Sequence, residues 1–470
     1  MGQLQPSGDY PWPSFACILP RQDKDISRPR PPGVFRRNRP DGPLIQRPAG
    51  ATPPASVSAP SRQEEPMERH DRSSIESLAA EIMPRLSPDG GAFETAEIGR
   101  DGPDLSPSAI SARIERSEET LRRAVEMDLT AADPALTRQV LVNGREGLEL
   151  IAGQRDRTHA PMAAVAAALE VIVRTDGSRP SFLVREDAPD FATSPAGGWA
   201  DLFGDPLREA EVRTALAAVG RIDITHPLMP YAGTGWLVAP DVIVTNRHVA
   251  QLFVAFPEGE APRLRTELDP RFDFGHEFAG RDSADARPLR ELLFCGARAI
   301  PPVGIDHGCL DLAVFRLAAP VPETRRPLAL AEGRRVALPQ TQVFVAGYPA
   351  RPDPASLGTV SETDRVLRLL FDKLWGFKRL APGEITPSTL GGRTLNHDAS
   401  TLGGNSGSLV MGLDSLPFVT GLHYGGSWGG DRTNWAHVLG AVLDEPGLPG
   451  LPHTTLAGLC AAEGIARKAF

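Results

Sequence analysis

The chain has 470 residues, of which 41% are hydrophobic and 23% are charged, and its formal net charge is −9. A chain of this length corresponds to more than one domain of about 100–200 residues each, and its apolar content suffices for a sizeable core. The negative net charge argues against a protein that binds nucleic acid through its overall charge. No run of apolar residues approaches the length of a membrane-spanning helix. We therefore expect neither nucleic acid nor a membrane as a partner.

The first part of the chain is rich in proline and arginine, as in "RPRPPGVFRRNRP". Such a composition cannot bury a core, so we predict a disordered tail over residues 1–66. The N-terminus also lacks the basic start and the long apolar stretch of a secretory signal. Because Met67 stands directly before the first helical pattern, translation from Met67 is an alternative, and the presence of residues 1–66 in the mature protein stays open.

The cysteines are scattered and form no C-x-x-C pair; they are Cys17, Cys295, Cys309 and Cys460. This pattern predicts free thiols and a reducing, cytoplasmic location. A disulfide between Cys295 and Cys309 is the alternative.

Residues 67–175 have the apolar spacing of helices. The stretch "SSIESLAAEIM" opens with a capping box, in which Glu76 follows Ser73 by three residues. The stretch "SAISARIERSEETLRRAVEMDL" then repeats apolar residues at helical intervals. Because the segment carries no metal or phosphate motif, we predict a small helical accessory module that binds a protein partner. Residues 176–218 are expected to be a linker or a small segment.

From about residue 219 the pattern becomes one of short strands. Runs such as "DLAVFRLAAP", "QVFVAGYP" and "FVTGLHYGG" alternate with Gly, Pro and Asp turns. This texture predicts a mainly β domain over residues 219–450, built as a barrel or a sandwich. One helical insertion is expected at residues 361–380, and residues 451–470 are expected to be a C-terminal tail.

Three residues beside these strands point to nucleophilic catalysis. His248 ends "VIVTNRHVA", Asp311 begins "DLAVFRL", and Ser406 lies in the glycine-rich stretch "TLGGNSGSLV". Each has an ordinary structural interpretation, as a strand cap, a strand-entry residue or a tight turn. Their order and their places next to strands favour a common site. Asp306 is an alternative acid, but no strand pattern follows it directly.

These residue types complement one another chemically. A serine hydroxyl needs a histidine to take its proton, and a buried carboxylate orients the imidazole and stabilises its charged form. The oxyanion formed on the substrate needs fixed donors, which the backbone N–H groups of Gly404 and Ser406 can supply. This chemistry requires no cofactor and no metal. The remaining histidines considered show no paired metal-ligand spacing: His276, His307, His397 and His437.

The motifs "GTGWLVAPDVIVTNRHV", "DLAVFRL" and "GGNSGS" resemble the histidine, aspartate and serine motifs of trypsin-like (chymotrypsin-fold) serine peptidases. The resemblance covers about residues 219–445. It implies two six-stranded antiparallel barrels, at about 219–318 and 328–445, with the three residues in the cleft between them. It also implies an endopeptidase that works through an acyl-enzyme.

Differences from the animal digestive enzymes indicate which branch of the family the sequence resembles. Asn405 replaces the aspartate that pairs with a freed N-terminus in those enzymes, and no cysteine stands near His248 or Ser406. The serine loop is similar to that of the bacterial glutamyl-endopeptidase branch. Because Asn405 carries no charge for that pairing, we do not expect activation by a cut that frees a new N-terminus. The missing disulfides are in keeping with a reducing, cytoplasmic compartment, and the branch itself is bacterial.

The same branch implies a pocket for an acidic side chain at the P1 position of the substrate. Thr401 and His423 match the residues that bind the carboxylate there, and Tyr424 and Gly425 continue the pocket strand. An imidazole and a hydroxyl can hold a carboxylate by charge-assisted hydrogen bonds. If His423 must be protonated for this, the preference should weaken above about pH 7. Alternatively, His423 only packs in the strand and Thr401 caps the turn.

The sequence therefore predicts a serine endopeptidase that acts on polypeptides, with an N-terminal helical module. Bacterial conflict and defence proteins join such modules to such peptidases, so a role as an effector in a system of that kind is a further hypothesis from the layout. Two alternatives remain. An inactive peptidase-like scaffold would bind a partner through its cleft, and an esterase would use the same three residues.

Overall fold

We describe a computed structural model, which covers residues 72–86, 103–126, 133–227, 229–281, 285–301, 304–333, 335–350, 366–367, 374–426 and 433–470. All of these residues belong to the second of the two units into which the chain divides, Glu68–Phe470. The tail expected at residues 1–66 lies outside the described residues.

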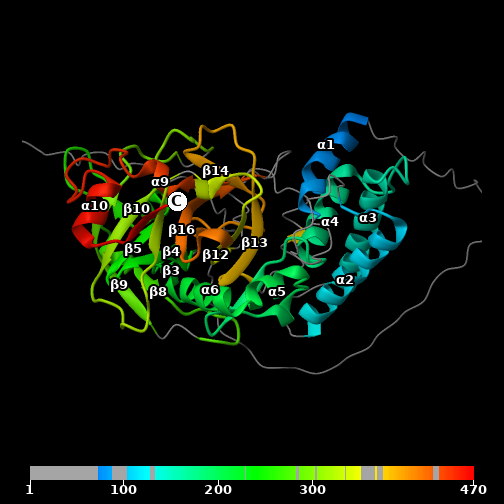
Figure 1. The fold of residues 1–470 in the computed structure, drawn as a ribbon, viewed down its shortest axis with the longest axis horizontal. Helices are drawn as coiled ribbons and strands as arrows, with labels where there is room; N and C mark the ends of the chain where they lie inside the picture. The colour runs from blue at the N-terminus through cyan, green and yellow to red at the C-terminus, as the bar shows by residue number, and fades with distance from the viewer. Residues whose placement is uncertain are drawn as a thin grey trace, which may run out of the picture. The chain divides into compact units, whose positions relative to one another are not determined.

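The N-terminal part of this unit is helical, as the sequence predicts (Figure 1). Its helices are α1 (Arg72–Ile82), the 3-10 turn η1 (Met83–Arg85), α2 (Pro107–Glu126), α3 (Pro134–Ile151) and α4 (Met162–Thr175). Helix α3 begins at a proline, which suits the first helical position, and the Asp133 side chain caps it by accepting from the Ala135 N–H. The apolar faces of the helices share a core that includes Ile82, Leu121 and Leu169.

The segment after α4 is part of the β-rich core and not a linker. It forms β1 (Phe182–Arg185), β2 (Ala188–Pro189), α5 (Gly198–Gly204) and α6 (Pro206–Ala218). Strand β1 pairs antiparallel with a strand almost 200 residues further along the chain, with Phe182 opposite Leu380. Phe182 and Phe203 are buried in the same hydrophobic cluster as the barrel residues. Local sequence patterns carry no information about so distant a strand partner, so the sequence did not indicate that residues 176–218, expected as a linker or a small segment, contribute a strand to this sheet.

Six strands close into an antiparallel barrel in the order β10-β5-β4-β3-β8-β9. They are β3 (Val219–Asp223), β4 (Tyr231–Ala239), β5 (Val242–Thr245), β8 (Arg271–Asp273), β9 (Ala286–Cys295) and β10 (Ala313–Leu317). The short helix α7 (Arg247–Ala250) follows β5, and β6 (Val254–Ala255) pairs with β7 (Arg263–Leu264) beside the barrel. Trp236, Phe272 and Phe315 are fully buried in its interior.

A second ring of six strands runs in the order β12-β15-β16-β17-β14-β13 and closes through the pairing of β12 with β13. Its strands are β12 (Gln342–Gly347), β13 (Arg379–Thr386), β14 (Thr394–His397), β15 (Leu409–Gly412), β16 (Phe418–Gly426) and β17 (Asn434–Val438). The predicted fold, mainly β with two six-stranded antiparallel barrels after a helical part, is therefore confirmed.

Two expectations at the edges of the second barrel differ from the structure. Residues 451–470 are not a tail, because they form α10 (Leu456–Glu463) and β18 (Arg467–Ala469) after the short helix α9 (Leu439–Val442). Strand β18 pairs in parallel with β11 (Ala329–Glu332), which in turn pairs with β16. The helical insertion expected at residues 361–380 ends earlier than predicted, because β13 begins at Arg379. Most of that insertion lies outside the described residues.

The helical part contacts the second barrel through a buried polar junction. The Arg179 guanidinium lies 2.8 Å from Asp398 Oδ2, just after β14, and the Ser400 hydroxyl donates to the Arg179 carbonyl at 2.6 Å. Arg179 is 1% exposed, so this contact is shielded from water. The junction places the helices next to the loop that leads to Ser406. Among the described residues, no helix is both long and apolar enough to cross a membrane.

Candidate active site

His248 is held against Asp311 at two points. It lies in the first turn of α7, directly after the fully buried strand β5, while Asp311 lies just before β10. The His248 N–H donates to Asp311 Oδ1 at 2.8 Å, and the ring Nδ1 lies 2.6 Å from Asp311 Oδ2. Strands β5 and β10 pair directly, which brings the two residues together. One carboxylate thus fixes both the backbone and the ring of His248 and leaves Nε2 for a third partner.

The pair shifts the pKa of both groups. Burial lowers the pKa of His248, but the charge of Asp311 and the hydrogen bond to it outweigh burial and raise this pKa above its usual value. Burial raises the pKa of Asp311, but His248 outweighs burial in turn, so the pKa of the carboxyl is lowered. The arrangement favours an ionised carboxylate beside an imidazole of increased basicity.

A second histidine, which the sequence analysis did not assign to the site, supports Asp311. The Asp311 N–H donates to His437 Nε2 at 2.9 Å. His437 is fully buried on β17, and burial lowers its pKa to about 3, so it is neutral and can accept this bond. Nothing in the local pattern "NWAHV" distinguishes it from a packed histidine, because its partner is more than 120 residues away.

Ser406 lies in a tight turn between the two barrels. The Thr234 N–H on β4 donates to the Ser406 carbonyl at 2.9 Å, and the Gly407 N–H donates to the His423 carbonyl on β16 at 3.0 Å. The turn is therefore tied to β4 of the first barrel and to β16 of the second. Among the described residues, no acceptor is bound to the N–H of Gly404 or of Ser406. These are the two amides expected to form the oxyanion hole.

The glycines of the turn are required by its backbone. Gly404 and Gly407 have φ values of +89° and +87°, which L side chains rarely adopt. A Cβ atom at Gly407 would also lie 2.0 Å from the Thr234 carbonyl oxygen. The turn can approach β4 this closely only because residue 407 has no side chain.

A cavity of about 230 Å³ adjoins the serine. Ser406, Thr401, His423 and Gly425 line it from the second barrel, so it gathers most of the residues predicted to bind substrate. Tyr424, which was placed in the same set, turns its side chain elsewhere. Its hydroxyl bonds His307 Nδ1 at 2.8 Å and its ring stacks on His437, because neighbouring residues of a strand face opposite sides.

The helical part also lines this cavity, which the sequence analysis did not anticipate. Arg85 from η1 and both Glu170 and Arg174 from α4 face it. These residues precede Ser406 by more than 200 positions, and no motif marks them. Only the tertiary contact of α4 with the loop after β14 identifies them as part of the site.

The protonation state of His423 in the structure differs from the one that the sequence analysis considered. Burial, with the charges of His397 and His248, lowers the pKa of His423 well below its usual value. Its Nδ1 lies 3.2 Å from Nε2 of His397, for which burial lowers the pKa to about 3. Both rings are therefore neutral near pH 7, and the expected protonation of His423 is not supported. If His397 donates to His423, the Nε2–H of His423 remains as a donor.

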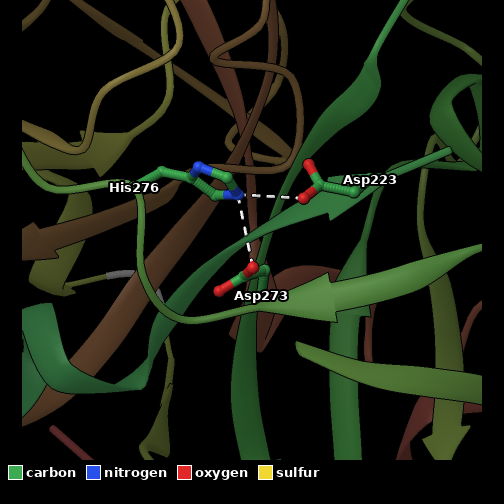
Figure 2. Close-up of side chains that lie close together, drawn as sticks. All are labelled: Asp223, Asp273 and His276. Atoms are coloured by element: carbon green, nitrogen blue, oxygen red, sulfur yellow. Dashed lines mark hydrogen bonds and ion pairs between the residues drawn. The ribbon is translucent and has the colours of Figure 1, made fainter. Parts of the chain in front are cut away.

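One group of described residues has the spacing of metal ligands: Asp223, Asp273 and His276 (Figure 2). His276 Nε2 lies 2.9 Å from Asp223 and 3.3 Å from Asp273. The Arg221 guanidinium, however, lies 2.8 Å from the same ring nitrogen and 2.6 Å from Asp223. A cation of the protein already occupies the position that a metal would take. We interpret this group as an ion-pair network that ties β3 to the turn after β8.

Two closed barrels, a His248–Asp311 pair on the first barrel and a glycine-rich serine turn tied to both barrels are the features of a peptidase of the trypsin-like class. Residues 233–415 match the family described as trypsin-like peptidase domain. A probable serine protease from Lysobacter enzymogenes is 32% identical over 284 residues, which are 56% of this chain and 70% of that protein. The chain therefore belongs to the trypsin-like serine peptidases, and its substrate class is polypeptide.

The solved structures to which this chain is similar have low sequence identity and low TM-scores. The inactive form of the Rv3671c protease of M. tuberculosis is 17% identical, covers 55% of this chain and 96% of that chain, and has a TM-score of 0.30. A Glu endopeptidase is 16% identical, covers 47% of this chain and 85% of that chain, and has a TM-score of 0.32. The predicted trypsin-like resemblance is confirmed by the family match, and the glutamyl-endopeptidase branch stays a prediction.

Proposed function

We propose that the protein is an active serine endopeptidase that uses His248, Asp311 and Ser406. The observation that carries this proposal is the two-point contact of Asp311 with His248, which leaves His248 Nε2 available. The turn of Ser406 adjoins a cavity, and within the described part of the chain no acceptor binds the N–H groups of Gly404 and Ser406, which supports the same role. Membership of a peptidase family supplies the reaction class.

In the proposed reaction, the Ser406 hydroxyl attacks the scissile carbonyl while His248 Nε2 takes its proton. Asp311 stabilises the imidazolium that forms, and the N–H groups of Gly404 and Ser406 bind the oxyanion. His248 then gives the proton to the leaving amine, and an acyl-enzyme remains. Water, deprotonated by the same nitrogen, attacks the ester carbonyl, and the proton returns to Ser406.

We further propose that the enzyme prefers acidic residues at P1. Thr401, His423 and Gly425 line the cavity beside the serine, which is where a P1 side chain would enter. A neutral His423 with a hydrogen on Nε2 would donate to the carboxylate without carrying a charge itself. Tyr424 would contribute through its backbone alone.

We propose an accessory module over residues 67–175 and a peptidase domain over 219–450, with α10 and β18 completing the second barrel. The described cysteines are all free, in keeping with a reducing cytoplasm. Recruitment of a protein partner by the module and a role as an effector in a bacterial conflict system are hypotheses supported by the layout alone.

Labelling with a fluorophosphonate tests the reaction. The wild-type protein should be labelled, while Ser406→Ala should not, and a proteome treated with the wild type should show new N-termini that are absent with the variant. A wild-type protein that is neither labelled nor proteolytic would favour the inactive scaffold. Cleavage of esters without cleavage of peptides would favour the esterase.

A further inference from the structure

Thr234 on β4 contacts the serine turn through both its backbone and its side chain. Its N–H donates to the Ser406 carbonyl at 2.9 Å, and its hydroxyl donates to the Gly404 carbonyl at 3.0 Å. Gly404 and Ser406 are the two residues whose N–H groups are proposed to bind the oxyanion. One residue of the first barrel therefore holds the carbonyls of both proposed oxyanion donors.

The Thr234 hydroxyl has a second partner, which sets the direction of its hydrogen. The Tyr348 N–H, directly after β12, donates to this hydroxyl at 3.0 Å. Because an N–H can only donate and a carbonyl can only accept, the single hydrogen of the hydroxyl must point to Gly404. Thr234 is fully buried, so no water competes for these bonds. The hydroxyl thus joins the end of β12 to the serine turn in one defined arrangement.

Thr234 is itself held in place by the first barrel. It lies opposite Arg221 of β3, and its carbonyl accepts from the Thr245 hydroxyl of β5 at 2.7 Å. A threonine side chain is also restricted about χ1, because two heavy atoms branch from its Cβ. The hydroxyl is therefore placed by a barrel strand, and a group on a strand is positioned more precisely than one on a loop.

Gly404 needs an external restraint of this kind. Its φ is +89°, and glycine adopts positive and negative φ about equally readily, so nothing in the residue itself selects this conformation. The peptide groups on both sides of Gly404 are bound: the Ala350 N–H donates to the Gly403 carbonyl, and the Thr234 hydroxyl donates to the Gly404 carbonyl. Oxyanion donors stabilise a transition state because their direction is fixed before the reaction. A bond that fixes the Gly404 backbone therefore affects catalysis.

We propose that Thr234 is a positioning residue of the oxyanion hole, because its hydroxyl holds the Gly404 backbone in the conformation that turns the Gly404 N–H toward the oxyanion. This inference rests on the proposed peptidase activity. Thr234 does not line the cavity beside Ser406, so it acts through Gly404 and not on the substrate. Loss of the hydroxyl removes the partner of the Gly404 carbonyl, and the glycine is then free to turn its N–H away.

The test compares Thr234→Val with Thr234→Ser on a fluorogenic peptide that the wild type cleaves. Valine keeps the shape of threonine but has no hydroxyl. We expect kcat of Thr234→Val to fall by about 10-fold or more, toward the roughly 10²–10³-fold loss of a missing oxyanion donor, with KM changed by less than about 3-fold. Thr234→Ser keeps the hydroxyl and should keep most of the wild-type kcat.

Thr420→Val is the matched control. Thr420 on β16 is also fully buried, and its hydroxyl bonds the Ser415 hydroxyl at 3.2 Å, in the turn between β15 and β16. Both valine variants should lower the free energy of unfolding, but Thr420→Val should leave kcat unchanged. A peptide aldehyde of the substrate sequence forms a hemiacetal whose oxygen occupies the oxyanion hole. Its affinity for Thr234→Val should fall by about the same factor as kcat/KM.

A crystal structure of the wild type with this aldehyde tests the same contact without a substitution, in case Thr234→Val does not fold. It should show the hemiacetal oxygen on the Gly404 N–H and the Thr234 hydroxyl on the Gly404 carbonyl. The inference is overturned if the hydroxyl lies away from that carbonyl, if Thr234→Val has the wild-type kcat, or if both valine variants lose kcat equally.

These outcomes are distinct from a failure of the proposed function. A wild type that is neither labelled by fluorophosphonate nor cleaves peptides refutes the peptidase activity, and the positioning role with it. A wild type that is labelled and proteolytic, together with an equally active Thr234→Val, refutes the positioning role alone.

Discussion

At the residue scale, Asp311 controls both the direction and the basicity of the His248 ring. Replacing Asp311 by Asn keeps the shape but removes the charge that raises the pKa of His248. In the proposed reaction the neutral imidazole is the base, so kcat/KM of the wild type should rise with pH through a midpoint above about 6.5. Asp311→Asn should lower kcat by about 10⁴-fold. Its remaining activity should rise at a lower pH, since burial alone then acts on His248.

A pH-rate profile on a fluorogenic peptide measures both effects. The control is the fluorophosphonate labelling of folded Asp311→Asn, which should be slow but detectable. A variant with wild-type kcat would remove Asp311 from the mechanism, and Asp306 would become the acid to test.

His423 leads to a second prediction at this scale. Because burial holds its pKa well below the usual value, His423 stays neutral from about pH 6 to pH 9. Its donation to an acidic side chain then does not depend on pH in this range. We expect the ratio of kcat/KM for Glu over Gln at P1 to remain constant there. A ratio that falls steeply above pH 7 would show that a protonated His423 binds the carboxylate.

At the scale of elements, the serine turn depends on Gly407. A Cβ atom at residue 407 would lie 2.0 Å from the Thr234 carbonyl oxygen, and a residue with a side chain would be strained at the φ of +87° found here. Gly407→Ala should therefore abolish labelling of Ser406 and lower the free energy of unfolding by more than about 2 kcal/mol. Gly153 is the matched control: its φ is +68°, but nothing lies within 4 Å of its Cβ position.

Gly153→Ala should lower the free energy of unfolding only by the cost of the unfavourable backbone angle, about 1–2 kcal/mol. It should leave the labelling of Ser406 unchanged. Urea unfolding and fluorophosphonate labelling of both variants separate strain from steric overlap. Equal effects of the two substitutions on stability and labelling would mean that the turn moves away from β4 without loss.

The network that joins β3 to the turn after β8 should make stability depend on pH. Burial and the charge of Arg221 lower the pKa of His276, but the bonds to Asp223 and Asp273 outweigh them, and the pKa is raised. Because the pKa of His276 is raised in the folded state, its protonated form contributes fully to stability below about pH 6.5. This contribution is lost as the pH rises through the folded-state pKa. The wild type should therefore lose stability relative to His276→Asn between about pH 6 and pH 9.

Asn suits this test because it tolerates the φ of +57° at residue 276. The measurement is the difference in the free energy of unfolding between the two proteins across that pH range. A difference that is the same at every pH would contradict the titration of His276.

At the scale of the whole molecule, local patterns predicted the residues beside strands and missed those that meet across the fold. His248, Asp311 and Ser406 could be proposed as a common site because each stands in a short motif next to an apolar strand. Two barrels could be predicted because short strands and turns repeat. The sequence could not predict the residues that reach the site from helices, barrels and loops far apart in the chain: Arg85, Glu170, Arg174 and His437. The same reason explains why the strands within residues 176–218 and 451–470 were not predicted.

Arg179 connects the helical part, the second barrel and the pocket, and its loss should affect all three. It is 1% exposed, ion-pairs with Asp398 and donates to the Pro84 carbonyl beside Arg85. Arg179→Met leaves the Asp398 carboxylate buried without its partner, and breaking a buried pair costs about 3–5 kcal/mol. We expect this loss in urea unfolding, together with a lower Glu-to-Gln ratio at P1, because η1 and α4 would no longer be held against the loop that carries Thr401.

The double variant Arg179→Met with Asp398→Asn separates charge from packing. It removes the unpaired carboxylate, so it should recover part of the stability lost in Arg179→Met, and the cycle of single and double variants measures the coupling between the two side chains. Because the guanidinium that positions the helices is still absent, the Glu-to-Gln ratio should remain low in the double variant. Recovery of the wild-type ratio would mean that the helices keep their place without Arg179, and that the junction supports the fold but not the pocket.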